Sequence, residues 1–87
     1  MTHFIKILEP YADAIIDGRK KFEVRQNDRG YNAGDKVCFR VLRQDKTLFL
    51  THPLNDKKYL ITYVHSGLGL QNNYVVFGIE EVKADEE

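Results

Sequence analysis

The chain has 87 residues, with 43% hydrophobic and 30% charged side chains and a formal net charge of zero. This length fits one domain rather than two, and the composition fits a folded globular domain rather than a disordered chain. The zero net charge excludes an argument for nucleic-acid binding from bulk charge, and the single cysteine, Cys38, excludes an intrachain disulfide.

The predicted elements, in chain order, are one short helix and five or six strands. Residues 3–8 are rich in β-forming side chains and predict a strand. Residues 9–18 predict a helix of about two turns, because Pro10 suits its start and Gly18 supplies a left-handed end. Alternating or β-rich patterns predict further strands at 20–26, 36–43, 47–50, 58–65 and 74–82.

The second predicted strand alternates cleanly. Phe22 and Val24 point to one side, and Lys21, Glu23 and Arg25 point to the other. The simplest interpretation makes the charged side the solvated face of the strand.

These elements lack regular βαβ alternation, so the pattern predicts a mainly β fold with a short α-helix (α+β), a small and mostly antiparallel β-barrel. The strand at 74–82 is apolar on both faces and is expected to be central. We expect one domain at 1–83 and a disordered acidic tail at 84–87. Since neither a signal peptide nor a long apolar run is visible, we expect a cytoplasmic protein without a membrane partner.

Charge is distributed unevenly along the chain. Residues 19–43 carry eight Lys or Arg against three acids, whereas residues 80–87 carry five acids against Lys83. A basic segment can attract a phosphate-bearing partner, or it can simply keep a small domain soluble. Charge alone leaves both interpretations open.

The segment 20–31 gathers the candidate binding residues. On a solvated strand its charges form an ordinary ladder of ion pairs. Arg29 near Tyr31, however, combines a planar donor group with an aromatic stacking face, and such groups contact phosphates and bases. The candidates for binding RNA or a nucleotide-like ligand are Lys20, Lys21, Glu23, Arg25, Asn27, Asp28, Arg29 and Tyr31.

Other kinds of site are not indicated. His3, His52 and His65 show no metal-ligand spacing, and the sequence has no phosphate loop, nucleophile elbow or dinucleotide fingerprint. We therefore expect no metal and no cofactor. Cys38 lies in a strand pattern and is interpreted as a small buried hydrophobe rather than a catalytic thiol.

Several motifs resemble the ASCH (activating signal cointegrator homology) family of the PUA-like superfamily, closest to a small bacterial and phage branch. They are His-x-x-Lys-Ile at the start, Gly-x-Lys-x-Phe-Glu-x-Arg after the helix, then Asn-Asp-Arg, an aromatic residue and Gly-Asp. Here these positions are His3, Lys6, Ile7, Gly18, Lys20, Phe22, Glu23, Arg25, Asn27, Asp28, Arg29, Tyr31, Gly34 and Asp35. With the similar segment 59–79, the resemblance covers most of 3–79.

This resemblance implies a PUA-like β-barrel with a cleft beside the first helix and the Gly-x-Lys motif. In the wider family that cleft is proposed to bind RNA, so we expect a nucleic-acid-binding module. A related ASCH branch hydrolyses acetylated cytidine nucleosides with a Lys, a Thr three residues later and a distant Glu. Lys20 matches the Lys, whereas Glu23 stands at the Thr position. The alternative is a small amidohydrolase in which Lys20 acts as base or activates the nucleophile and Glu23 orients water or substrate.

Overall fold

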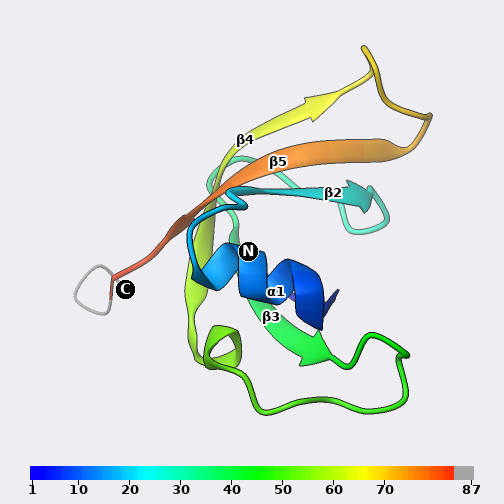
Figure 1. Ribbon diagram of the computed structural model, residues 1–87. Helices are drawn as coiled ribbons and strands as arrows, with labels where there is room; N and C mark the ends of the chain where they lie inside the picture. The colour runs from blue at the N-terminus through cyan, green and yellow to red at the C-terminus, as the bar shows by residue number, and fades with distance from the viewer. Residues whose placement is uncertain (84–87) are drawn as a thin grey trace.

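The computed structural model describes residues 1–83 of the chain (Figure 1). The elements, in order, are β1 (Thr2–Leu8), α1 (Glu9–Ile16), β2 (Phe22–Gln26), β3 (Lys36–Leu42), the 3-10 helix η1 (Pro53–Asp56), β4 (Lys58–Ser66) and β5 (Tyr74–Glu81). The acidic tail expected at 84–87 lies outside the described residues. Within 1–83, no helix is long and apolar enough to cross a membrane.

The strands form one mixed sheet in the order β1-β3-β4-β5-β2. β1 and β3 are parallel, and the other three neighbouring pairs are antiparallel. The prediction of a mainly β fold with one short helix is confirmed, and β5 lies between two strands as its apolar faces indicated. The expected closed barrel is not observed, because β1 and β2 are opposite edges of the sheet and do not pair with each other.

Two arginine side chains, one on β2 and one after it in the chain, donate hydrogen bonds to the backbone of the other edge strand, β1. Arg25 on β2 donates to the Lys6 carbonyl of β1, and Arg29 Nη1 donates to the Phe4 carbonyl at 3.0 Å. We call these two contacts, Arg25 with Lys6 and Arg29 with Phe4, the seam. A guanidinium reaches much further than a backbone N–H and presents several donors. The seam therefore connects the two edges through side chains, whereas a closed barrel would need a backbone ladder between them.

Helix α1 closes one end of this space. Pro10 lies in its first turn and Gly18, with φ +85°, follows its end, as predicted. Ala12 and Ile15 are buried against the sheet, whereas Tyr11 is 54% exposed. Figure 1 shows α1 below β2 and beside β3. The small apolar face of the short helix is thus buried in the core, and the Tyr11 side chain remains on the surface.

The faces of β2 are the reverse of the simplest expectation. Glu23 is 4% exposed, whereas Phe22 and Val24 are 45% and 49% exposed. Alternation determines which side chains share a face, but it does not determine which face is buried. Here the carboxylate can be buried because Lys20 and Arg25 both contact it. The structure therefore corrects the interpretation of this charged face as solvated.

The prediction of a strand at 47–50 is also wrong. The chain there forms a single bridge between Leu42 and Phe49, inside an otherwise irregular segment. Both the backbone N–H and the hydroxyl of Thr47 donate to the Asp45 carboxylate, and Lys46 has a left-handed φ of +64°. Such local side-chain hydrogen bonds offer the backbone an alternative to a strand ladder. This turn prevents a regular strand and leaves a loop at 43–52.

Three residues of the resembling motifs form a structural cluster behind the seam. His3 Nε2 lies 2.9 Å from Asp35 Oδ2, and its ring centroid lies 4.8 Å from that of Tyr31. The Asp35 carboxylate also accepts from the Asn32 N–H and the N-terminal ammonium. The hydrogen bond from His3 is the main cause that holds the pKa of Asp35 below its ordinary value of 3.8.

This lowered pKa predicts an acid-sensitive contribution to stability. Because the folded form binds the Asp35 proton less tightly than the unfolded chain, the contribution is present above about pH 4 and is lost as the pH falls through the folded pKa. Asp35→Asn should therefore lower stability at pH 6 and flatten its decline as the pH falls below about 4. Urea unfolding across this range measures both effects. An unchanged slope below pH 4 contradicts the assignment.

Candidate ligand-binding cleft

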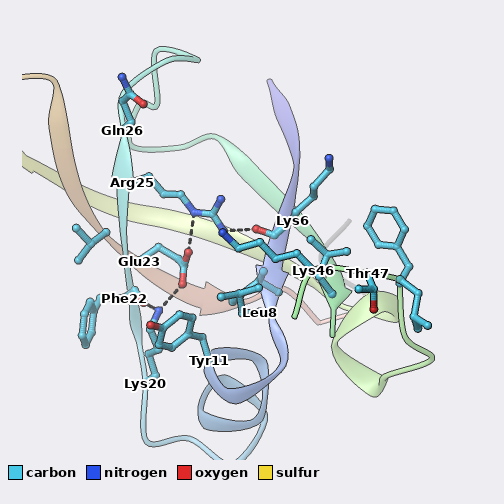
Figure 2. A pocket seen from close by; sticks show the side chains of 15 residues that line it. Lys6, Leu8, Tyr11, Lys20, Phe22, Glu23, Arg25, Gln26, Lys46 and Thr47 are labelled. Atoms are coloured by element: carbon cyan, nitrogen blue, oxygen red, sulfur yellow. Dashed lines mark hydrogen bonds and ion pairs between the residues drawn. The ribbon is translucent and has the colours of Figure 1, made fainter. Parts of the chain in front are cut away.

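A cleft of about 950 Å³ opens between the two edge strands (Figure 2). One wall is β2 with Lys20 before it, and the other is the loop residues 46–49. Residues 6–8 of β1, Tyr11 and Leu42 complete the lining. Helix α1, both sheet edges and the loop therefore all contribute to one site. Its size is in the usual range for pockets that hold small ligands or nucleotides.

Glu23 lies at the base of the cleft between two cations. Lys20 Nζ contacts Glu23 Oε1, and Arg25 Nε donates to Glu23 Oε2 at 2.8 Å. Lys20 Nζ also donates to the Phe22 carbonyl at 2.6 Å. Figure 2 shows the carboxylate directed from β2 toward Arg25, which continues the network to Lys6 of β1. One buried carboxylate thus orients the cations on this wall.

The predicted site residues divide into two groups. Lys20, Glu23 and Arg25 line the cleft and contact one another. The others do not line it, although they lie just before β2 or after it in the chain. These are Lys21, Asn27, Asp28, Arg29 and Tyr31.

The second group includes residues with structural contacts. The Asn27 side chain accepts from the Tyr31 N–H at 3.1 Å, and Arg29 belongs to the seam. Tyr31 is 4% exposed, and its ring packs between His3 and Phe77 with centroid separations of 4.8 and 4.9 Å. Burial raises the pKa of its hydroxyl, opposed by the nearby arginines. The ring therefore has no open face for a base.

Several residues that line the cleft were not among the predicted site residues. Lys6 and Lys46 line it, and neither forms an ion pair within residues 1–83. Tyr11 and Phe49 line it as well and are 54% and 42% exposed. Lys6 stood in the resembling motif without an assigned role. Nothing in the sequence indicated 46–49, because only the fold brings that loop opposite β2.

The electrostatics of the cleft favour an anion. Four cationic side chains line it against the single carboxylate of Glu23. Exposed aromatic and aliphatic side chains lie between these charges, so the site can accept a ligand that is both negatively charged and partly flat and apolar. No group of three or more His, Cys, Asp or Glu that could hold a metal ion occurs within 1–83.

Comparison with known proteins identifies a family. Residues 2–79 match the family described as "Domain of unknown function (DUF3850)". The chain belongs to this family. The match contains every residue that lines the cleft, so the cleft is part of the DUF3850 domain itself.

A solved structure shares the fold. The chain is similar to the protein titled "Crystal structure of hypothetical protein PH0355", with a TM-score of 0.62 and 16% identity over 94% of this chain and 100% of that chain. At this identity the likeness concerns the fold alone. A comparison with curated proteins gives no match.

Proposed function

We propose that this protein is a nucleic-acid-binding module that holds RNA in the cleft between β1, β2 and the loop at 43–52. The observation that carries the proposal is the composition of the cleft, in which cations without a carboxylate partner stand beside exposed aromatic rings. Phosphates are attracted by Lys and Arg, and unpaired bases stack on aromatic side chains. The resemblance of residues 18–35 to the ASCH family supports the same function.

The side chains have different roles in this proposal. Glu23 neutralises much of the charge of Lys20 and Arg25, so these two orient the wall and supply part of the field. Lys6 and Lys46 are the side chains expected to contact phosphates directly. They come from two different elements, β1 and the loop at 43–52. A backbone bound in the cleft can therefore meet cations supplied by both elements.

A salt-dependent titration tests this function. Wild-type protein is titrated with a fluorescent single-stranded RNA of about seven nucleotides, a length within the usual site sizes of small binding folds. We expect saturable binding at low salt. With two phosphate contacts, the logarithm of affinity should fall against log salt with a slope of about −1.4. Absence of saturable binding at about 50 mM salt contradicts the function.

A second candidate is an amidohydrolase that acts on an acetylated cytidine-type nucleoside. The observation that favours it is the direct contact between Lys20 Nζ and the Glu23 carboxylate within the cleft. In this case water adds to the amide carbonyl, the C–N bond breaks, and acetate and cytidine leave. Chromatography after incubation with acetylated cytidine tests it. Absence of cytidine at high enzyme concentration excludes this substrate.

A further inference from the structure

We infer that the loop at 43–52 is the base-binding wall of the cleft, with Phe49 as a stacking platform and Lys46 as a phosphate contact. The ligand is then a single-stranded nucleic acid with an unpaired base, rather than a duplex read through its backbone. This inference rests on the proposed function and specifies it. Its two residues, Lys46 and Phe49, belong to none of the motifs described above, and the family description assigns them no role.

Two cationic side chains lie close to the Phe49 ring, which suits it to act as a stacking platform. Arg40 Cζ lies 4.0 Å from its ring centroid, and Lys6 Nζ lies 6.0 Å from it. A guanidinium stacked on one face holds an aromatic ring in place and is attracted by the negative charge of that face. The ring nevertheless remains 42% exposed and lines the cleft. Its exposed part belongs to the lining of the cleft, where a base can stack with a cation close to it.

The loop is fixed in position, although it is not a strand. The Leu50 N–H donates to the Val41 carbonyl at 2.9 Å, and the Arg43 N–H donates to the Leu48 carbonyl at 3.0 Å. Asn55 of η1 donates from its side chain to the Leu50 carbonyl and accepts from the Val41 N–H, each at 2.9 Å. These bonds tie the loop to β3 and to η1. Because the wall is already held in place, ligand binding does not have to order it, and the free-energy cost of ordering a loop is avoided.

Lys46 occupies a position that its backbone does not favour. Its φ of +64° lies in the left-handed region, which glycine adopts freely and lysine does not. Figure 2 shows its side chain extending into the cleft. Residues kept in such conformations are often retained for a functional side chain. Lysine at this turn is therefore explained by the charge that it places in the cleft.

The positive φ of Lys46 allows a test that separates loss of binding from loss of stability. Lys46→Gly removes the charge and also relieves the backbone, so the midpoint of unfolding should stay unchanged or rise. RNA affinity should fall by about two- to fivefold at low salt, and the salt slope should lose about 0.7. The matched control is Lys83→Ala, which removes an exposed lysine outside the cleft and should change affinity less than twofold.

Phe49 is tested in parallel. Phe49→Ala should weaken binding of the single strand by about tenfold, whereas Phe49→Trp, which keeps a stacking face, should retain it. Phe4→Ala, which removes a 65% exposed ring outside the cleft, serves as the control. An abasic strand and an RNA duplex of equal charge should bind about tenfold more weakly than the single strand.

The outcomes separate the two proposals. If wild-type protein binds none of these nucleic acids, the proposed function fails and the inference fails with it. If the single strand binds but the abasic strand or the duplex binds as tightly, nucleic-acid binding stands and the base-binding wall is wrong. Equal affinity of Phe49→Ala and wild type for the single strand overturns the wall in the same way.

Discussion

Replacing Glu23 by alanine is expected to lower the free energy of unfolding by about 2–3 kcal/mol. Removing one partner of a buried ion pair typically costs about 3–5 kcal/mol, because the other charge is left without compensation. Here Lys20 and Arg25 keep 17% and 24% of their side chains exposed, so water recovers part of this cost. Chemical denaturation measures the change.

Glu81→Ala is the matched control for this substitution. Glu81 also pairs with a lysine, since its carboxylate lies 3.0 Å from Lys57 Nζ, but its side chain is 44% exposed. An exposed pair of this kind contributes at most about 1 kcal/mol. If Glu23→Ala costs no more than Glu81→Ala, the buried network does not organise the cleft wall.

Glu23→Gln gives a different readout, because it keeps the size of the side chain and removes its charge. With the only carboxylate of the cleft neutralised, Lys20 and Arg25 are available to phosphates. RNA affinity at low salt should therefore rise several-fold. An amidohydrolase that uses this carboxylate should instead lose turnover. Weaker RNA binding by Glu23→Gln argues against an electrostatic role of the cleft.

Tyr31→Ala is expected to have the largest effect on stability, a loss of about 3 kcal/mol or more. Truncating a buried aromatic side chain removes its packing and leaves a cavity. Tyr31 is 4% exposed and contacts the rings of His3 and Phe77, so both neighbours lose a partner. The control is Tyr63→Ala at a 69% exposed position, where the change should stay within about 0.5 kcal/mol.

Tyr31→Phe separates the structural role of this ring from a binding role. The aromatic packing is retained, so stability and RNA affinity should both stay close to wild type. If Tyr31→Phe binds RNA tenfold more weakly while its stability is unchanged, the hydroxyl contacts the ligand and the buried placement does not describe the binding form.

The sequence predicted the elements of this fold better than their arrangement. Pro10 and Gly18 predicted the helix, and alternating or β-rich segments predicted the five strands of the sheet. These signals are local, because each depends on backbone conformation or on period-2 spacing within one segment. Local signals do not determine the order of the strands or which strands form the two edges. The arginine seam between these edges could therefore not be predicted from them.

The candidate site was predicted on one wall only. Lys20, Glu23 and Arg25 are adjacent in sequence and lie together in the cleft. Burial of Glu23 reversed the expected faces of β2, because ion pairing can outweigh the tendency of apolar residues to occupy the interior. Lys46 and Phe49 come from a distant loop, and their position depends on the β3–η1 connection. A single sequence contains no pattern that joins them to β2.

The most direct test of a nucleic-acid site in this cleft is the mapping of amide NMR shifts during titration with a single-stranded RNA. We expect saturable shifts that cluster at 6–8, 20–26 and 46–49, and little change in the β4–β5 loop at 67–73. A cluster at 20–26 alone supports binding at the motif wall without the loop wall. Absence of saturable shifts, or shifts confined to 67–73, contradicts the assignment of the cleft as the binding site.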